Sequence, residues 1–429
     1  MFMKYTPFIV FFLSLVPIQV HAQPAKSPSE EVLRGRASIS PSLVRLDPQE
    51  KQKFKIILKA KRLQGADVAH SVKWSVNDVL GGNEEVGTIT EDGLYTAPAV
   101  PPVPREVHIV ADVEGVENRF LFATVVINAP GQPYEMVSSW FEPKGKSRLL
   151  VDPHCLCLDK DGNLIIADYN GSRVLRFTPE GKYLGDIGRG TGEKPGMVKL
   201  PRVVQMDAAG RIFVSDQKSD KPRIQVFTPE GDFLYAFAEK GIRPGQMLRA
   251  HGMVFDSKGF LYVVDVDTMR INVYEPATGK FVRRWGKDGS ATGEFNAPHG
   301  IAIDRNDDIF VVGYYGPCQK FTADGKFLFD FAYPDPPDGA VYFHSIASDR
   351  WGNVYLTVRG AAGYGGAIED NEGRKVSIMK FNNNGDHICN LTLKVKAHSE
   401  NWATIDEQGK VYAIFQSNEE LGVQVFEPR

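Results

Sequence analysis

Cysteine is scarce in this chain, with four among 429 residues: Cys155, Cys157, Cys318 and Cys389. No two of them form a CxxC pair, so the sequence gives no sign of a cysteine metal site. Cys155 and Cys157 lie two positions apart in a predicted strand, where they share a face but pair poorly with each other. We expect the cysteines to be buried small hydrophobic residues, and one disulfide bridge is left open.

The chain also lacks an excess of charge of either sign, since the formal net charge is −3 and no basic run stands out. This composition does not indicate a nucleic-acid partner. Long apolar runs are absent after the first segment, MFMKYTPFIVFFLSLVPIQVHAQ, which predicts a secretory signal peptide over residues 1–22. An N-terminal membrane anchor is the alternative, although the run is short for a span. We expect a periplasmic or secreted protein with no membrane span in the mature chain.

Residues 23–36 are polar and predict a flexible lead-in. From 37 to 128 the pattern changes to short strands such as FKIIL, VKWSV, VHIVADV and FLFATVVI, which predict a β-sandwich. The stretch WSVNDVLGGNEEVGTITEDGLYTAPA resembles the bacterial Ig-like repeats of surface and secreted proteins. This resemblance implies a spacer or adhesion module. Residues 129–134 are the expected linker.

The remaining chain, residues 135–429, repeats. Six apolar runs each end at an aspartate, with spacings of 45 to 57 residues: Asp159, Asp207, Asp256, Asp304, Asp349 and Asp406. Each unit reads as four strands with an Asp-x-x-Gly-like turn, which predicts six propeller blades in an all-β protein. The last unit lacks a fourth strand, and MVSSWFEPKG (136–145) matches that strand in other units. We therefore expect an N-terminal strand to close the propeller. These units resemble NHL repeats.

A histidine recurs at the start of the first strand in four units, as in APHGIAID at 297–304. Across the six units this slot holds His154, Arg202, His251, His299, His344 and Asn401. We expect these side chains at one mouth of the central channel. Neutral imidazoles are common zinc ligands, and a catalytic zinc keeps three protein ligands. His154, His251 and His344 lie on alternate units, so they are the predicted zinc triad. His299 is left as a fourth ligand, a supporting group or a proton carrier. The alternative is that these histidines only bond the rim backbone.

The residues that follow the second strand should reach the same mouth. They include Tyr169, Tyr314, Tyr315 and Arg359. A tyrosine acts as a base only if nearby positive charge lowers its pKa, and arginines bind carboxylates through paired hydrogen bonds.

The propeller resembles the peptidylglycine-amidating lyase family in runs such as APHGIAID and RAHGMVFD. The resemblance implies zinc on His154, His251 and His344, with Tyr315 as base and Arg202 and Arg359 binding the carboxylate of a small peptide-like substrate. Cleavage would give an amide and glyoxylate. Two departures are that the third histidine comes first in the chain and that Gly313 replaces the aspartate expected before the tyrosines. The insert at 361–375 is predicted to be a mobile lid or a disordered loop.

Other functions stay open. One is a non-enzymatic propeller that binds an extracellular protein, peptide or glycan on its rim. Another is a calcium-dependent lactonase, which is disfavoured because the regular acidic residues belong to turns on the opposite face. A third is a zinc propeller with different lyase chemistry. A structural Ca²⁺ in the channel is also left open, although no motif indicates it.

Overall fold

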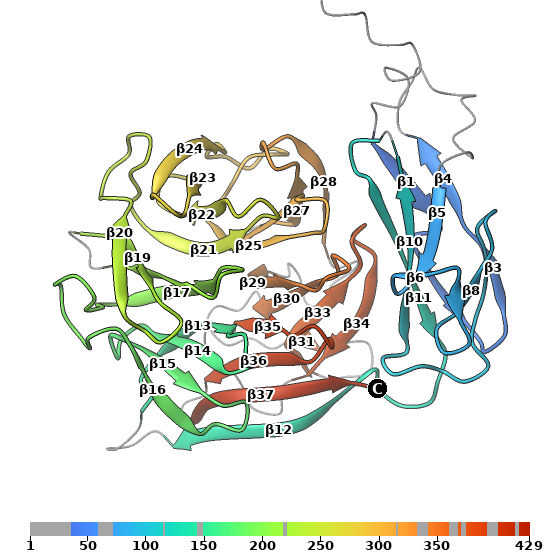
Figure 1. Ribbon diagram of the computed structural model, residues 1–429, viewed down its shortest axis with the longest axis horizontal. Helices are drawn as coiled ribbons and strands as arrows, with labels where there is room; N and C mark the ends of the chain where they lie inside the picture. Colours follow the sequence, from blue (N-terminus) through green and yellow to red (C-terminus); the bar gives the residue numbers. More distant parts are fainter. Residues whose placement is uncertain are drawn as a thin grey trace, which may run out of the picture.

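The computed structural model describes residues 36–58, 72–114, 116–143, 149–217, 221–314, 316–332, 342–359, 368–369, 375–392, 402–416 and 420–429. Within these ranges the regular structure is made of strands and contains no helix (Figure 1), so the all-β prediction is confirmed. The predictions for residues 1–22, for Tyr315 and Asn401, and for most of the 361–375 insert lie outside the described residues. In the part that is described, no helix is long and apolar enough to cross a membrane.

The first eleven strands form a unit with its own core, which we call the N-terminal unit. Its sheets have the orders β2-β11-β10-β5-β6 and β3-β9-β8-β7, with β1 paired to β4. Trp74, Tyr95 and Ile109 belong to the core of this unit. The strands are β1 (Ala37–Ser40), β2 (Leu43–Leu46), β3 (Lys51–Lys53), β4 (Lys55–Leu58), β5 (Val72–Val76), β6 (Val79–Leu80), β7 (Gly82–Asn83), β8 (Gly87–Ile89), β9 (Leu94–Thr96), β10 (Glu106–Val113) and β11 (Phe120–Ile127).

The rest of the described chain contains six antiparallel sheets of four strands, numbered here in chain order. Sheet 1 is β13 (Pro153–Leu158), β14 (Leu164–Asp168), β15 (Arg173–Phe177) and β16 (Tyr183–Ile187). Sheet 2 is β17 (Pro201–Met206), β18 (Ile212–Asp216), β19 (Arg223–Phe227) and β20 (Phe233–Phe237). Sheet 3 is β21 (Ala250–Phe255), β22 (Leu261–Asp265), β23 (Arg270–Glu275) and β24 (Lys280–Trp285).

Sheet 4 is β25 (Pro298–Ile303), β26 (Ile309–Gly313), β27 (Cys318–Phe321) and β28 (Phe327–Phe331). Sheet 5 is β29 (Tyr342–Ser348), β30 (Val354–Arg359), β33 (Ile378–Phe381) and β34 (His387–Leu391). Sheet 6 is β35 (Ala403–Ile405), β36 (Val411–Gln416), β37 (Glu420–Pro428) and β12 (Tyr134–Pro143). A small ladder joins β31 (Ile368–Glu369) to β32 (Lys375–Val376).

The first strands of neighbouring sheets contact each other, from β13 through β17, β21, β25 and β29 to β35, and β35 also contacts β13. A cavity of about 190 Å³ is lined by residues of all six strands. Sheets arranged around a common channel in this way are the architecture of a β-propeller, and we call the six sheets the propeller unit. Its last sheet combines both ends of the unit, because β12 pairs antiparallel with β37. The pairing predicted for the segment around Met136 is therefore found.

Six aspartates fix the turns between the first and second strands. In sheet 1 the carboxylate of Asp159 accepts hydrogen bonds from the backbone N–H groups of Asp161 and Asn163 at 3.0 and 2.8 Å. The same pair of bonds recurs at Asp207, Asp256, Asp304, Asp349 and Asp406. Aspartate stabilises such turns because its short side chain reaches the backbone two residues on. The repeated acidic residues are thus structural.

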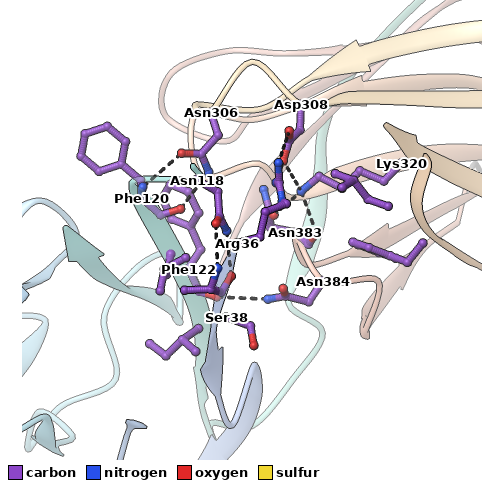
Figure 2. Close-up of a pocket in the computed structure, with 15 residues that line it drawn as sticks. Arg36, Ser38, Asn118, Phe120, Phe122, Asn306, Asp308, Lys320, Asn383 and Asn384 are labelled. Carbon is purple, nitrogen blue, oxygen red and sulfur yellow. Dashed lines mark hydrogen bonds and ion pairs between the residues drawn. The ribbon is translucent and has the colours of Figure 1, made fainter. Parts of the chain in front are cut away.

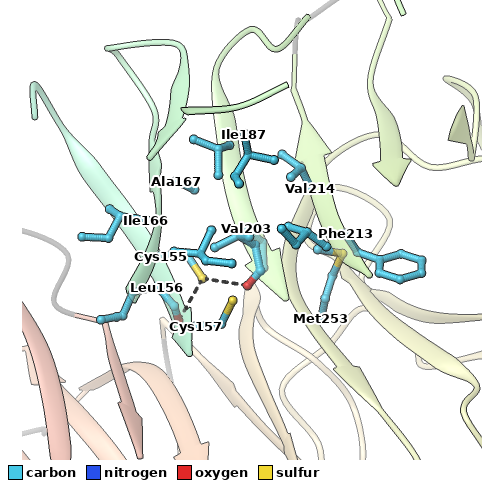
Figure 3. Packing of buried hydrophobic residues seen from close by; sticks show 14 of the residues in the cluster. Cys155, Leu156, Cys157, Ile166, Ala167, Ile187, Val203, Phe213, Val214 and Met253 are labelled. Carbon is cyan, nitrogen blue, oxygen red and sulfur yellow. Dashed lines mark hydrogen bonds between the residues drawn. The ribbon is translucent and has the colours of Figure 1, made fainter. Parts of the chain in front are cut away.

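The hydrophobic core of the propeller unit lies between adjacent sheets. Figure 3 shows Cys155 of sheet 1 beside Val203 of sheet 2, and Phe213 of sheet 2 on the side that faces sheet 3, where its ring lies 5.0 Å from that of Phe255 between centroids. Cys155 and Cys157 are buried, and burial raises the pKa of the Cys155 thiol to about 12. All four cysteines are free thiols, so the disulfide that the sequence left open is not formed. The prediction of buried, hydrophobic cysteines is confirmed for Cys155, Cys157 and Cys318, and Cys389 is partly buried.

Candidate functional site: the histidine cluster at the channel mouth

The histidine slot coincides with a β-bulge in sheets 1 to 5. The register between first and second strands breaks at 153–155, 201–204, 250–252, 298–300 and 343–346, and each break encloses the slot residue. A bulge leaves a residue out of the ladder and redirects its side chain. The five slot residues found at bulges are His154, Arg202, His251, His299 and His344. Their shared bulge explains how first strands in five sheets can present one residue each to the same end of the channel.

His299 lies at the centre of this arrangement and is fully buried. Its ring centroid is 4.3 Å from that of His251 and 4.2 Å from that of His344. Trp402, which directly precedes β35, lies 6.2 Å from His299 and 6.1 Å from His344 between ring centroids. We call Arg202, His251, His299 and His344 the histidine cluster.

The contacts of His299 fix its tautomer. Nδ1 lies 3.0 Å from the carbonyl oxygen of His344, and a carbonyl can only accept, so Nδ1 carries the proton. Nε2 is then an acceptor, and Nη2 of Arg202 donates to it at 3.3 Å. The lone pair of Nε2 therefore faces the guanidinium of Arg202. The three roles left open for His299 stay predictions.

Arg202 spans the mouth from sheet 1 to sheet 4 and is buried. Its guanidinium carbon lies 5.7 Å from the ring centre of Tyr169 on one side, while Nη2 bonds His299 on the other. A guanidinium carries five N–H donors in a planar fork, a geometry that suits carboxylates. The structure brings Arg202 into contact with His299, and the role of Arg202 stays a prediction.

His154 has a carboxylate partner. Its Nε2 lies 3.1 Å from Oδ2 of Asp152, and Nδ2 of Asn170 donates to the same oxygen at 2.5 Å. The His154 ring lies 4.8 Å from that of Tyr169 between centroids. A carboxylate behind an imidazole fixes its orientation, which suits either a proton-transfer role or a metal ligand.

Imidazole nitrogens are the right donors for zinc, but their placement does not complete a site. Among the described residues, no group of three or more histidine, cysteine, aspartate or glutamate side chains is placed to hold a metal ion. The His299 ring contacts the rings of both His251 and His344, and its Nε2 accepts a hydrogen bond from Arg202. The zinc triad of His154, His251 and His344 stays a prediction.

The tyrosine over the cluster in the described part of the chain is Tyr314. Its ring centroid is 4.5 Å from that of His299 and 5.7 Å from that of His344. Tyr315, the residue that the sequence favoured, lies outside the described residues. Arg359 ends β30, where its backbone pairs with Tyr342, and its side chain is not described. Sequence reasoning noted Tyr314 and Tyr169 on the rim without assigning them a role, and it missed Trp402, whose only signal was its place beside the histidine slot.

In sheet 4 the second strand ends in Gly313, where sheets 1 to 3 have an aspartate. In sheets 1 to 3 the second strand ends in Asp168, Asp216 or Asp265, and each carboxylate accepts backbone N–H groups of the loop before the first strand. At Gly313 a Cβ would lie 2.7 Å from the carbonyl oxygen of Asn296 and 3.0 Å from that of Ala297. The loop thus packs directly on the glycine, and the Tyr314 N–H donates to Ala297.

Comparison with known proteins gives one family match, the NHL repeat, over residues 150–177. The chain is 30% identical over 152 residues to peptidylglycine alpha-amidating monooxygenase of Rattus norvegicus, which is 33% of this chain and 15% of that protein. It is 25% identical over 139 residues to protein brain tumor of Drosophila melanogaster, covering 32% and 12%. The chain therefore spans only a small part of these curated relatives.

Among solved structures, a streptogramin B lyase aligns with 85% of this chain and all of its own, at a TM-score of 0.45 and 14% identity. A gluconolactonase from Xanthomonas campestris aligns with a TM-score of 0.46 and 12% identity, over 65% of this chain and 87% of its own. By its own topology the described chain is an all-β protein with four-stranded sheets in a propeller arrangement, and residues 150–177 match the NHL repeat.

Proposed function

We propose that residues 135–429 form a six-bladed NHL propeller, preceded by an Ig-like domain over 37–128. We also propose that the mouth of the channel binds the carboxylate of a peptide-like substrate. The proposal includes a signal peptide over 1–22, and hence a secreted or periplasmic location. One observation carries the binding proposal: the buried guanidinium of Arg202 is held between Tyr169 and the neutral His299. A fixed and buried guanidinium binds a carboxylate strongly, because a bidentate pair meets little competing water.

The reaction that we propose is cleavage of a peptidyl-α-hydroxyglycine-like C–N bond. The hydroxyl loses its proton, its carbon becomes a carbonyl, and the electron pair of the breaking bond goes to nitrogen, which takes up a proton. The products are an amide and glyoxylate. The similarity of one third of the chain to a peptidylglycine alpha-amidating enzyme supports this choice.

Arg202 and Arg359 are the proposed carboxylate ligands, and Tyr315 is the proposed base for the hydroxyl proton. The developing negative charge then lies next to fixed donors, which is where electrostatic stabilisation acts. No step is assigned to zinc, because the described donors are not gathered around one point. Zinc on His154, His251 and His344 is tested separately by the metal content of the purified protein.

The experiment measures glyoxylate release from an α-hydroxyglycine peptide by the full chain, its Arg202→Met variant and a matched Arg243→Met variant. Arg243 is exposed in a loop and is not part of the cluster. We expect Arg202→Met to lower kcat/KM by at least about 30-fold, since removing one member of a buried charge pair costs 2–5 kcal/mol. Equal activity of the two variants would exclude Arg202 from the site.

A non-enzymatic binding propeller is the second candidate. The close packing of the His251, His299 and His344 rings favours it, because buried and mutually packed rings leave little room for a reacting group. This candidate predicts that a peptide with a free carboxylate binds the wild-type protein, that Arg202→Met weakens binding, and that no glyoxylate appears. Calorimetric titration of the same peptide separates the two functions.

A further inference from the structure

The two long strands of the N-terminal unit, β10 and β11, are buried on both faces. In β10, Val107, Ile109 and Ala111 pack in the core of the N-terminal unit. The alternate residues Glu106, His108 and Val110 are also buried, although they point to the opposite face of the sheet. Strands covered on both sides read as near-continuous apolar runs, which fits VHIVADV and FLFATVVI.

The second face is covered by sheet 5 of the propeller unit. Val110 and Phe122 form an apolar cluster with Trp351, and the His108 ring stacks on Trp351 at 4.8 Å between centroids. Nδ2 of Asn384 donates to the carbonyl oxygen of Phe122 at 3.1 Å. Figure 1 places β34 of sheet 5 and β28 of sheet 4 next to this unit.

Around a small pocket at the edge of the same junction, Asn306 bonds both backbone groups of Phe120, at 3.1 and 2.8 Å (Figure 2). The propeller unit thus satisfies the backbone polar groups of Phe120 at the start of β11 in the N-terminal unit. Such bonds fix the relative position of two units more strictly than apolar contact does, because they are directional.

Two buried charges of the propeller unit take an ionic partner from the N-terminal unit. The Lys380 ammonium is 4% exposed and pairs with Glu106. Asp308, also 4% exposed, is bound by Arg36. Separation of the units would leave both charges without these partners, and breaking a buried pair in that way is strongly destabilising. The contact is therefore an integral part of the fold rather than a loose tether.

His108 is the titratable group in this junction whose protonation would most directly oppose docking of the two units. Its side chain is buried, and Nδ1 has no hydrogen-bond partner among the described residues. The charged groups facing it are Lys380 and Arg350 of the propeller unit, and Glu106 lies two residues away on its own strand. Burial lowers the pKa of His108 well below its usual value, and the two cations lower it further.

We infer that β10 and β11 hold the N-terminal unit on sheet 5 as one rigid body at neutral pH, and that protonation of His108 weakens this docking in acid. The neutral His108 ring stacks on Trp351. An imidazolium at the same position would be a buried charge beside two cations, which is unfavourable. The surface thus has a defined partner, the propeller of the same chain. This inference does not depend on the proposed enzymatic function.

The direction of the pH effect follows from proton linkage. The released state binds a proton with a pKa near 6.5, whereas the docked state binds it only at lower pH. Docking is therefore at full strength above about pH 6.5. It weakens as the pH falls from there toward the lowered pKa of the docked state, by up to about tenfold in the docking constant per pH unit.

The test is hydroxyl-radical footprinting of the full chain between pH 7.5 and pH 5. Trp351 is 9% exposed at the junction, and Trp74 is 7% exposed inside the core of the N-terminal unit, so Trp74 is the internal control. We expect oxidation of Trp351 to rise severalfold at low pH while that of Trp74 stays constant.

His108→Phe keeps an aromatic ring on Trp351 but cannot titrate, so it should retain low Trp351 oxidation at pH 5. If this variant does not fold, His108→Gln provides the same comparison. The inference is overturned if the wild type and the His108 variant respond equally to acid, if Trp351 stays protected throughout, or if Trp351 and Trp74 become oxidised together, which would report global unfolding.

Discussion

At the scale of single residues, Gly313 directly precedes Tyr314 and lies against the loop before β25. The loop carbonyls of Asn296 and Ala297 occupy the space that a side chain would need. Tyr314 then follows directly, with its backbone N–H bonded to Ala297 and its ring against His299. A glycine at this point thus lets the loop pack directly on the end of β26. The N–H bond of the next residue does not depend on the glycine, because Tyr169, Gln217 and Val266 make the same bond after an aspartate in sheets 1 to 3.

Gly313→Ala should lower the free energy of unfolding by about 1–3 kcal/mol, since an added methyl group forces backbone to move in a packed region. The measurement is urea denaturation. Gly162→Ala is the control, because at φ +79° its added Cβ meets no atom within 4 Å, so only the backbone conformation is strained. A Gly313 variant with unchanged stability would show that the loop can withdraw without cost.

The candidate site was partly predictable at this scale. A histidine that recurs in one slot of a repeat stands out in the sequence, so Arg202, His251, His299 and His344 could be predicted to gather. The role of His299 could not, because it depends on which nitrogen faces the His344 carbonyl and which faces Arg202, 97 positions away. The contact between Tyr314 and His299 could not be predicted either, because it depends on the turn after β26.

At the scale of structural elements, the two ends of a first strand in the propeller unit carry different residues, as β17 shows. In β17, Arg202 lies at the start, at the mouth of the channel, and Asp207 follows the last residue, in the turn at the opposite end. The Asp207 carboxylate accepts hydrogen bonds from the N–H groups of Ala209 and Arg211. One end of the strand therefore presents a candidate ligand, and the other fixes the turn.

Asp207→Ala should cost about 1–3 kcal/mol of stability, because two backbone donors lose their acceptor. Affinity for a carboxylate ligand at Arg202 should stay unchanged. Thermal denaturation and calorimetric titration measure the two quantities on one sample. Asp207→Asn keeps one acceptor oxygen and should lose less stability than the alanine variant. A change in ligand affinity would mean that the turn and the mouth are coupled.

At the scale of the whole molecule, sheet 6 joins the beginning and the end of the propeller unit. Strand β12 enters directly after the N-terminal unit and pairs with β37 near the C-terminus. Gly422 lies at the closest point of this pairing, where a Cβ would be 2.1 Å from the carbonyl oxygen of Trp140. The last strand cannot carry a larger residue there without separating from β12.

Gly422→Val should therefore destabilise the whole propeller unit by about 3 kcal/mol or more, at the upper end of the range for overpacking. Near-ultraviolet circular dichroism during chemical denaturation should show an earlier transition of the aromatic core. Gly131→Ala, in the segment before β12, is the control, since its Cβ meets no atom within 4 Å and only its backbone conformation, at φ +87°, is strained. Equal stability of the two variants would argue against the importance of the β12–β37 pairing.

The sequence by itself determined the features that short-range chemistry encodes: the alternating strands, the aspartate turns, the repeated histidine slot and the match between the segment near Met136 and a missing fourth strand. Only the tertiary structure decided what depends on side-chain direction across distant elements. The bulges aim the slot residues inward, Arg202 crosses the channel to His299, and the propeller covers the second face of β10. These features arise from the packing of whole sheets, which no local pattern of residues specifies.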